Sequence, residues 1–462
     1  MRLFRVSIPK SILVLIASEF LWMLGTLLLM GQLVMGDEFS LFLWLDDGFY
    51  RLLIVVGSTM LVLYFLDLYN TFVYPSKLLL LQTFVIALGG VLIIQSVIGY
   101  LFPGWIAPRS ILLPGGLLIS ILFVPWRTAF VRIFMPALGT EAVLFLGANP
   151  LAQEIVRSIR ERPELAIRPI GFIDDSYPAG EEIAGVKVLG KLSDLVEVVD
   201  KTRPNRIVVG MDERRQKLPV EDLLHMRFSG LHIEEAAVTF QAAFGRVPTR
   251  GLRHSQLIFS SELGPVPRNL QIQTFYSVLL AAIALIILSP ILLLVALAVR
   301  LSSRGPVLFR QTRVGIRGQN FTIYKFRSMV VDAESQTGAV WASRNDPRIT
   351  PIGRFLRKTR LDELPQLFNV IRREMSIVGP RPERPEFVGQ LSSLIPFYAH
   401  RHSVKPGITG WAQINYKYGE TIEDAVVKLE YDMYYIKNLS PALDLFIMLH
   451  TLKAMLSADM GH

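Results

Sequence analysis

Long apolar runs constrain this chain more than any other feature of its sequence. Four of them lie in the first third, at residues 11–34, 52–66, 78–102 and 111–126, and a fifth covers residues 278–299. A helix needs about 20 apolar residues to cross the hydrocarbon core of a bilayer. The first and third runs reach this length, the second and fourth can span within a bundle, and a cleaved signal peptide fits the first run poorly. We therefore expect a membrane-embedded protein that also has globular parts.

Cations beside these runs predict their orientation. The first ten residues contain three cations, and Arg127 and Arg132 follow the fourth run. Cytoplasmic loops are enriched in Lys and Arg. Both ends of the predicted four-helix bundle, residues 1–135, should therefore face the cytoplasm.

Positive charge is concentrated in one later stretch. The whole chain has a net charge of +9, whereas residues 300–373 contain 15 Lys and Arg against 5 Asp and Glu, a local balance of +10. Nucleic acid, phospholipid head groups and phosphorylated substrates all qualify as partners on charge alone. The chain has no cysteine, so disulfides, thiolate metal sites and Cys nucleophiles are excluded. Its histidines form no His-Glu-x-x-His motif, and a zinc site is not expected.

A different pattern begins near residue 136. Strand-like runs at residues 142–146, 168–172 and 206–209 alternate with helical segments at residues 151–162 and 192–199. This alternation predicts a parallel α/β domain over residues 136–262.

The loop after the first of these strands decides what that domain does. It reads Gly147-Ala148-Asn149 and has one glycine where the dinucleotide fingerprint needs three. We favour a degenerate Rossmann-like domain with a structural or regulatory role. Nucleotide binding, with Asp174 or Asp175 on a ribose, is the alternative.

The fifth apolar run opens the last part of the chain. Residues 263–273 read as a linker, and the catalytic domain, residues 274–462, should begin with a helix over residues 276–300. Ser289 and Pro290 interrupt this helix, and proline removes a backbone donor and kinks a helix. Because cations follow the run, we predict a re-entrant helix that returns to the cytoplasmic face. An ordinary kinked span is the alternative.

Asp362 and Glu363 are the strongest candidates for chemistry. They precede a helix that Pro365 should open and that runs to about Ile371. One carboxylate at such a position can attack phosphorus to give an acyl phosphate while its neighbour holds Mg²⁺. An adjacent Asp-Glu pair is more often a solvated helix cap. Four cations directly before the pair favour the catalytic interpretation: Arg354, Arg357, Lys358 and Arg360.

Other segments offer cations for phosphate. Lys325 and Arg327 alternate with Phe326 as on a strand, which puts both charges on one face. Gly379-Pro380-Arg381-Pro382 is rigid, and the planar fork of Arg381 suits a diphosphate. An incidental arginine in a structural loop is the alternative. Residues 352–359 are amphipathic, which fits an interfacial helix and a packed surface helix equally.

Four motifs in order resemble the large monotopic phosphoglycosyl transferases, in their polyprenyl-phosphate hexose-1-phosphate transferase branch. They are Lys-Phe-Arg-Ser-Met (325–329), Leu-Asp-Glu-Leu-Pro-Gln-Leu (361–367), Met-Ser-Ile-Val-Gly-Pro-Arg-Pro (375–382) and Lys-Pro-Gly-Ile-Thr-Gly-Trp-Ala-Gln (405–413). Residues 418–456 are similar to the exopolysaccharide-associated subgroup. The resemblance implies a helical membrane bundle, a Rossmann-like α/β domain and a mixed α/β catalytic domain with a re-entrant helix broken at Ser289-Pro290.

The resemblance also implies a role for each matching residue. Asp362 would be the nucleophile, Glu363 would activate it, both would hold Mg²⁺, and Arg381 would contact the diphosphate. Further expected anion ligands are Lys325, Arg327, Arg354, Arg357 and Lys417, where Lys417 belongs to an Asn-Tyr-Lys segment that replaces the family's Asn-Gly-Arg. Arg372-Arg373-Glu374-Met375 stands where the family commonly has Gly-Asp-Met, so the resemblance leaves a tight turn there open.

The implied reaction is a ping-pong transfer. Asp362 would attack a UDP-sugar with release of UMP, and polyprenyl (undecaprenyl) phosphate would then take the sugar phosphate, as the first membrane step of exopolysaccharide assembly. The enzyme would lie in the bacterial inner membrane with its catalytic domain on the cytoplasmic face, among phospholipids and without nucleic acid, and a homodimer is left open. Glucose, galactose and an N-acetylhexosamine remain open as the sugar. A membrane-anchored nucleotide-sugar dehydratase is one alternative, but the Tyr-x-x-x-Lys motif that it needs does not occur in this sequence. A non-enzymatic membrane scaffold is the other alternative.

Overall fold

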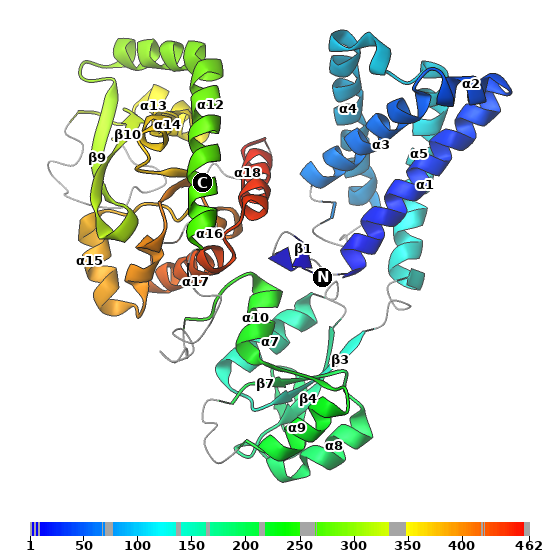
Figure 1. The fold of residues 1–462 in the computed structure, drawn as a ribbon, viewed down its shortest axis with the longest axis vertical. Helices are drawn as coiled ribbons and strands as arrows, with labels where there is room; N and C mark the ends of the chain where they lie inside the picture. Colours follow the sequence, from blue (N-terminus) through cyan, green and yellow to red (C-terminus); the bar gives the residue numbers. More distant parts are fainter. Residues whose placement is uncertain are drawn as a thin grey trace. The chain divides into compact units, whose positions relative to one another are not determined.

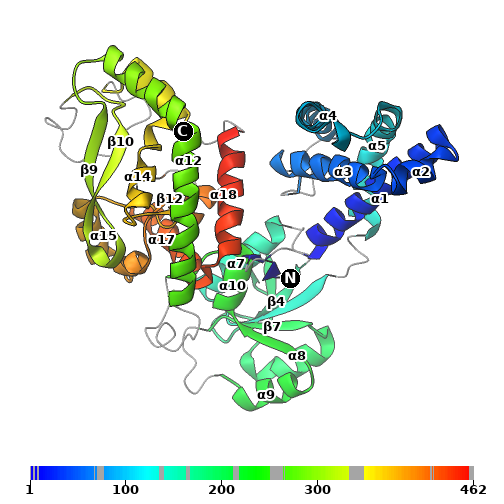
Figure 2. The same cartoon turned by 45° about the horizontal axis from the view of Figure 1, so that its top comes forward.

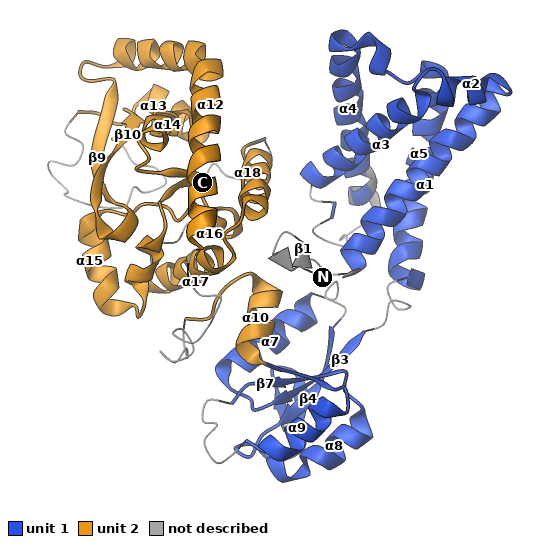
Figure 3. Cartoon of the chain, viewed as in Figure 1, with its two compact units in different colours: residues 1, 8–234 blue, residues 2–7, 235–462 orange. Residues whose placement is uncertain are grey.

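The computed structural model divides the chain into two compact units (Figure 3). One comprises residues 1 and 8–234, and the other residues 2–7 and 235–462. The structure describes residues 2–3, 6–7, 10–66, 68–69, 77–134, 140–162, 167–211, 218–249, 264, 266–331, 348–416, 419 and 421–456. Each unit is described by itself.

The first unit begins with the predicted helical bundle (Figure 1). Its helices are α1 (Lys10–Met35), α2 (Glu38–Trp44), α3 (Gly48–Phe65), α4 (Lys77–Leu101) and α5 (Arg109–Ala129), which continues as a π-helical turn, η2 (Phe130–Phe134). By length and composition, α1, α3, α4 and α5 could each cross a membrane. The four apolar runs are therefore helices, as predicted. Phe84 and Phe123 stack at the centre with their ring centroids 4.0 Å apart.

A buried ion pair joins α1 to α5 inside this apolar bundle. Arg127 donates to Glu19 over 2.6 Å and to the carbonyl of Leu68 over 2.5 Å, and the Tyr69 hydroxyl donates to Glu19 over 2.8 Å. Glu19 is fully buried and Arg127 is 3% exposed. A charge in a membrane helix is costly unless it is paired, so this pair fixes which helices meet.

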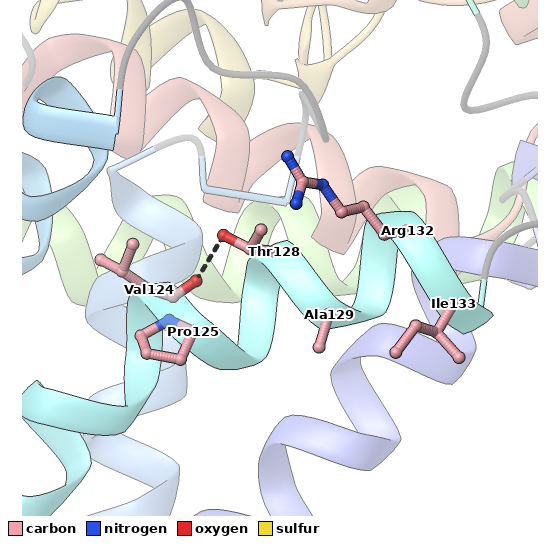
Figure 4. A pocket seen from close by; sticks show the side chains of 6 residues that line it. All are labelled: Val124, Pro125, Thr128, Ala129, Arg132 and Ile133. Carbon is pink, nitrogen blue, oxygen red and sulfur yellow. Dashed lines mark hydrogen bonds between the residues drawn. The ribbon is translucent and has the colours of Figure 1, made fainter.

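A groove runs along α5 and its π-helical end (Figure 4). The Thr128 hydroxyl donates to the Val124 carbonyl over 2.8 Å along one side of it, and Arg132 is its charged lining residue. Among the described residues, those that line the groove include no carboxylate and no set of metal ligands.

The α/β domain completes the first unit. Its strands and helices are β3 (Glu141–Leu146), α7 (Pro150–Glu161), β4 (Ile167–Ile173), β5 (Glu182–Ile183), β6 (Val186–Gly190), α8 (Leu195–Thr202), β7 (Arg206–Val209), α9 (Val220–Phe228) and β8 (His232–Glu235). The sheet order is β5-β6-β4-β3-β7-β8, with β3 parallel to β4 and β7 and an antiparallel β5–β6 pair at the edge. The predicted α/β domain is thus present, with a mixed sheet.

The loop after β3 satisfies its own polar groups. The Ala148 N–H donates to Asp174 over 2.7 Å, and Asn149 caps α7 by accepting from the Ala152 N–H over 2.9 Å. A Cβ on Gly147 would lie 2.7 Å from the Gly210 carbonyl, so the loops after β3 and β7 are in close contact. Rossmann domains bind a pyrophosphate with free N–H groups at this place. Here the N–H groups of Ala148 and Ala152 donate to acceptors within the protein, which favours the structural or regulatory interpretation.

The second unit is a mixed α/β domain built on α12 (Pro267–Ser302). A β9–β10 hairpin (Leu308–Val314, Asn320–Phe326) follows α12, and β11 (Ser376–Val378) pairs in parallel with β12 (Gly407–Thr409). The helices and turns are α10 (Ala236–Phe244), α13 (Pro351–Lys358), η6 (Leu361–Glu363), α14 (Gln366–Ile371), α15 (Pro385–Leu394), η7 (Tyr398–Ser403), α16 (Trp411–Asn415), α17 (Ile422–Asn438) and α18 (Pro441–Leu456). A two-stranded ribbon, β1 (Arg2–Leu3) and β2 (Val6–Ser7), also belongs to this unit.

This unit begins earlier than the predicted boundaries at residues 262 and 274. Trp411 donates to the Gly245 carbonyl over 2.7 Å, and the Val247 N–H donates to the Glu430 carbonyl over 3.0 Å. Arg246 also lies 3.4 Å from the Glu430 carboxylate. These long-range contacts attach residues 236–249 to the second unit, and hydrophobic periodicity alone carries no sign of them.

Helix α12 consists of two limbs that meet at a sharp bend (Figures 1 and 2). Ala281 in the first limb packs with Ile323 and Val370, and Val299 in the second packs with Phe326, so both limbs rest on the same domain.

The Ser-Pro pair explains how the helix tolerates its interruption. Pro290 has no N–H to donate to the Ile286 carbonyl, and the Ser289 hydroxyl donates to that carbonyl instead, over 2.8 Å. A carbonyl facing lipid must find a partner within the protein.

Candidate active site

Asp362 and Glu363 lie in the 3₁₀ turn η6, directly before α14. The predicted helix to Ile371 is confirmed. Arg360 opens the turn in the left-handed region, with φ of 59°, and its carbonyl accepts from the Glu363 N–H over 3.2 Å. The two carboxylates are 7% and 8% exposed, so they are not a solvated helix cap.

Glu363 is the meeting point of three motifs that lie far apart in the sequence. Lys325 on β10 and Arg381 after β11 both donate to its Oε1 atom, over 2.7 Å and 2.9 Å. Burial alone would raise the pKa of Glu363, but Arg381 and Lys325 hold that pKa well below its ordinary value. Glu363 is therefore ionised at any pH at which the protein works.

Asp362 has a different environment from its neighbour. Among the described residues, no cation forms an ion pair with it. Burial and the charge of Glu363 raise its pKa to about 6, against the opposing effect of Lys325, Arg357 and Arg360. The pair thus offers one permanently charged carboxylate and one whose oxygens are available for chemistry.

Arg357, in the last turn of α13, is a further cation that acts on Asp362. It lowers the pKa of Asp362, and in the described part of the chain its Nη1 atom is buried without an acceptor. An unsatisfied buried donor beside a carboxylate is suited to a phosphate oxygen. Arg354, one turn earlier, is exposed to solvent.

Arg327 lies elsewhere than predicted. It is 6% exposed, and its guanidinium donates to the carbonyls of Ser303 and Arg304 over 2.8 Å and 3.3 Å, at the end of α12. Lys325 and Arg327 therefore do not present their charges together, and the structure does not bring Arg327 to the carboxylate pair. Lys417 lies outside the described residues.

Sequence reasoning did not select Asn369, which holds α14 against the hairpin. This fully buried side chain donates to the Thr322 carbonyl and to Glu374, both over 2.7 Å, and accepts from the Tyr324 N–H over 3.2 Å. Tyr324 precedes Lys325, so Asn369 fixes the strand that presents the lysine. A polar residue within the apolar Leu-Phe-Asn-Val-Ile segment was the available signal.

The turn at residues 372–375 answers a question that the sequence left open. Arg373 adopts φ of 62°, and the N–H groups of Glu374 and Met375 donate to the Asn369 carbonyl over 3.0 Å and 3.3 Å. The tight turn forms, although an arginine takes the position where glycine is unstrained.

Backbone contacts fix the Arg381 loop to β12. The Gly379 N–H donates to the Thr409 carbonyl over 2.9 Å. A Cβ on Gly407 would lie 2.1 Å from the Gly379 nitrogen, so only glycine allows this approach. The Val-Gly-Pro-Arg-Pro and Pro-Gly-Ile-Thr-Gly motifs therefore form one structural unit.

The carboxylate pair fits Mg²⁺ in one particular manner. Asp362 and the Oε2 atom of Glu363 can supply oxygens, and the described residues include no group of three or more His, Asp or Glu side chains arranged for a metal. Protein-bound Mg²⁺ commonly takes one or two carboxylates together with substrate phosphates. The residues therefore suit Mg²⁺ bound with a diphosphate rather than a metal held by protein alone.

Comparisons with known proteins place the chain among sugar transferases. A bacterial sugar transferase family model matches residues 268–458, and a CoA-binding domain model matches residues 49–224. The UDP-glucose:undecaprenyl-phosphate glucose-1-phosphate transferase of Xanthomonas campestris pv. campestris is 34% identical over 368 residues, which cover 75% of this chain and 73% of that protein. The Klebsiella pneumoniae protein of the same name is 38% identical over 314 residues, 67% of this chain and 66% of its own length.

A third relative differs in its named sugar. The UDP-N-acetylgalactosamine-undecaprenyl-phosphate N-acetylgalactosaminephosphotransferase of Aeromonas hydrophila is 44% identical over 226 residues, 49% of this chain and 52% of that protein. The chain thus spans between about half and three quarters of the length of these relatives. The motifs, the matched model and the long Xanthomonas match agree: the chain belongs to the bacterial sugar transferase family, within the phosphoglycosyl transferases that its sequence resembles.

Proposed function

We propose that this protein transfers a sugar 1-phosphate from a UDP-sugar to undecaprenyl phosphate and releases UMP. The observation that carries the proposal is the unequal carboxylate pair: Glu363 binds Lys325 and Arg381, while Asp362 beside it is buried and has no ion pair among the described residues. The names of the relatives fit this reaction class.

In the first step, an Asp362 oxygen attacks the phosphorus that bears the sugar. The bond from that phosphorus to the bridging oxygen breaks, UMP leaves with the electron pair, and a phosphosugar–aspartate forms. Lys325 and Arg381, already oriented by Glu363, neutralise the diphosphate, and Arg357 offers a further donor. When bound by Asp362 and Glu363 together with the substrate, Mg²⁺ would supply further neutralisation of the leaving phosphate.

In the second step, a phosphate oxygen of the lipid attacks the same phosphorus. The bond to Asp362 breaks, the carboxylate is regenerated, and the product is a lipid diphosphate sugar. Two anions approach each other in this step, so the cations of residues 300–373 have an electrostatic purpose.

The membrane arrangement belongs to the same proposal. Both limbs of α12 pack on one domain, and Leu293, Leu294 and Leu297 are more than half exposed, which supports a helix that enters lipid and returns to the cytoplasmic face. On α13, exposed Phe355 beside exposed Arg354 suits the interface of the bacterial inner membrane, where Arg354 would meet phospholipid or substrate phosphates. A homodimer stays a prediction.

The test uses full-length protein in lipid nanodiscs and a sugar-labelled UDP-sugar without lipid acceptor. Wild type should gain the mass of one sugar phosphate, Asp362→Asn should gain none, and Glu363→Gln should react far more slowly. Glu386→Gln, a carboxylate-to-amide change at an exposed residue of α15, is the matched control and should label as wild type. UMP release by Asp362→Asn at near the wild-type rate would end the proposal. A panel of UDP-glucose, UDP-galactose and UDP-N-acetylhexosamines then identifies the sugar.

A further inference from the structure

Arg401, in turn η7, is a buried cation next to the Arg381 loop. Its Nη2 atom donates to the Arg381 carbonyl over 3.1 Å and lies 2.7 Å from Asp432 on α17, while Nη1 donates to the Tyr398 hydroxyl over 2.6 Å. Arg401 is 6% exposed and Asp432 is 1% exposed. One guanidinium therefore connects three segments of the domain.

The segment around Arg381 is held at every carbonyl. Donors reach four successive carbonyls: Gly407 N to Pro380 O (3.0 Å), Arg401 Nη2 to Arg381 O (3.1 Å), Arg313 Nη1 to Pro382 O (3.0 Å) and Val314 N to Glu383 O (2.9 Å). This bonding is what buried backbone carbonyls normally require, and here its donors come from β9, η7 and β12. It fixes the backbone direction from which the Arg381 side chain leaves.

The Arg381 side chain depends on that backbone. It is 29% exposed, so packing alone does not hold it, yet its Nη2 atom lies 2.9 Å from Glu363. A cation that must meet a diphosphate in one orientation needs a rigid support, since a displacement of about 1 Å can cost a hundred-fold in rate.

We propose that Arg401, held by Asp432, is the positioning residue that directs Arg381 toward the diphosphate of the nucleotide-sugar. Of Arg381, Arg401 contacts only the backbone carbonyl, so in this proposal it acts on the diphosphate through Arg381. The inference rests on the proposed function for the identity of the ligand, and on hydrogen bonds alone for the support of the loop.

Lysine cannot replace Arg401 in this role. The planar fork donates to Tyr398 and to the Arg381 carbonyl in fixed directions while it lies at ion-pair distance from Asp432, whereas an ammonium group is a point charge on a flexible stem. Arg401→Lys should therefore keep the charge opposite Asp432 and release the Arg381 carbonyl. We expect the KM for the UDP-sugar to rise about ten- to hundred-fold with a smaller change in kcat, because binding of the diphosphate is weakened before and during the chemical step.

The chain offers a matched control on the same helix. Partly buried Arg246 and buried Glu430 form another arginine–carboxylate pair, 3.4 Å apart, and Glu430 precedes Asp432 by two residues on α17. This pair holds residues 246–249 through the Thr249 N–H, which donates to Glu430 over 3.1 Å. Arg246→Lys and Glu430→Gln should cost stability in the same manner as Arg401→Lys and Asp432→Asn but leave KM within about two-fold of wild type.

Two measurements in nanodiscs decide the matter. The first is KM and kcat for UMP release in Arg401→Lys, in Arg381→Ala and in the double variant. If Arg401 acts through Arg381, its substitution should add less than two-fold to KM once Arg381 is alanine. The second is hydrogen exchange of the peptide covering residues 376–387, which should accelerate in Arg401→Lys and not in Arg246→Lys. Tyr398→Phe, which removes one acceptor of Arg401, gives a milder variant if Arg401→Lys does not fold.

Each outcome has one meaning. A higher KM with faster exchange, absent from the double variant, supports the proposal. An unchanged KM with unchanged exchange in folded Arg401→Lys or Tyr398→Phe overturns it, as does a rise in KM that persists in full without Arg381. Faster exchange with an unchanged KM would keep Arg401 as the support of the loop and remove Arg381 from the diphosphate, which overturns that part of the proposed function instead.

Discussion

The unequal carboxylate pair predicts an acid limb in the pH profile of the first chemical step. Burial and the charge of Glu363 raise the pKa of Asp362 from 3.8 to about 6, whereas Arg381 and Lys325 keep Glu363 ionised. Only the ionised form of Asp362 can attack phosphorus. The second-order rate constant for UMP release should therefore rise with pH up to about 6 and level off above it.

The magnitude follows from the raised pKa. With a pKa near 6, about one tenth of Asp362 is ionised at pH 5 and about nine tenths at pH 7. The rate should therefore fall nearly ten-fold when the pH is lowered from 7 to 5. With an ordinary pKa of 3.8, the profile would be flat above pH 5. A shift of about two units corresponds to roughly 3 kcal/mol against the charged form in the folded protein.

Glu363→Gln provides the perturbation. It removes the negative charge that is, after burial, the second cause of the raised pKa. The pKa of Asp362 should fall, and the acid limb should move below pH 6, even though the overall rate drops because glutamine cannot hold Lys325 and Arg381 as ion pairs. A lower rate together with a plateau that begins at lower pH is expected only if the charge of Glu363 raises the pKa of Asp362.

The assay is rapid-quench measurement of UMP release at saturating Mg²⁺ without lipid acceptor. A second-order rate constant reports the groups of the free enzyme. The lipid is omitted because a phosphate monoester itself titrates near pH 6. Glu386→Gln should retain the wild-type limb, and thermal unfolding at each pH excludes loss of structure. A flat wild-type profile between pH 5 and 7, or an unmoved limb in Glu363→Gln, would refute the reasoning.

Three further predictions concern stability, cation roles and topology. Arg373→Gly should raise the unfolding temperature by about 1–4 °C at unchanged activity, since a left-handed arginine is strained by about 1 kcal/mol; no rise in a thermal melt would mean that the turn holds no strain. Lys325→Met should raise the KM for the UDP-sugar in a stable protein, whereas the main effect of Arg327→Met should be a lower unfolding temperature, because it releases the carbonyls after α12. The opposite result would indicate that Arg327 is an anion ligand. In this cysteine-free chain, Ser302→Cys and Lys201→Cys on α8 should both react with a thiol reagent only from the cytoplasmic side; periplasmic labelling of Ser302→Cys would exclude the re-entrant helix.

Local patterns predicted what local physics determines. The apolar runs became helices because their length and composition leave no other way to satisfy the backbone in lipid. The strands of the α/β domain followed from alternation with helical segments, and Asp362-Glu363 stood at a helix start because Pro365 precedes α14. The structure brings Lys325, Asp362, Glu363 and Arg381 together, and their chemical roles remain proposals.

The sequence was a poor guide wherever a residue acts through a distant partner. Arg327 is only two residues from Lys325 and shares the neighbour Phe326 with it, but its acceptors at residues 303 and 304 lie at the end of α12. Asn369 stands within an apolar segment and Arg401 stands between two histidines. The role of each side chain becomes visible only with the strand or loop that it holds. Arg373 shows the converse, because the bonds to the Asn369 carbonyl impose a turn that the local residue disfavours.

Adjacent carboxylates are chemically equivalent until the fold distinguishes them. Nothing within Leu-Asp-Glu-Leu assigns the nucleophile, since either side chain could attack phosphorus and either could hold a cation. The distinction arises from β10 and the loop after β11, which direct Lys325 and Arg381 to the same oxygen of Glu363. One carboxylate is thereby committed to orienting two cations, and its negative charge in turn raises the pKa of the other. In the proposed reaction the nucleophile is therefore the carboxylate that the distant cations do not bind, and the burial of Asp362 together with the charge of Glu363 sets the pH at which it can begin to react.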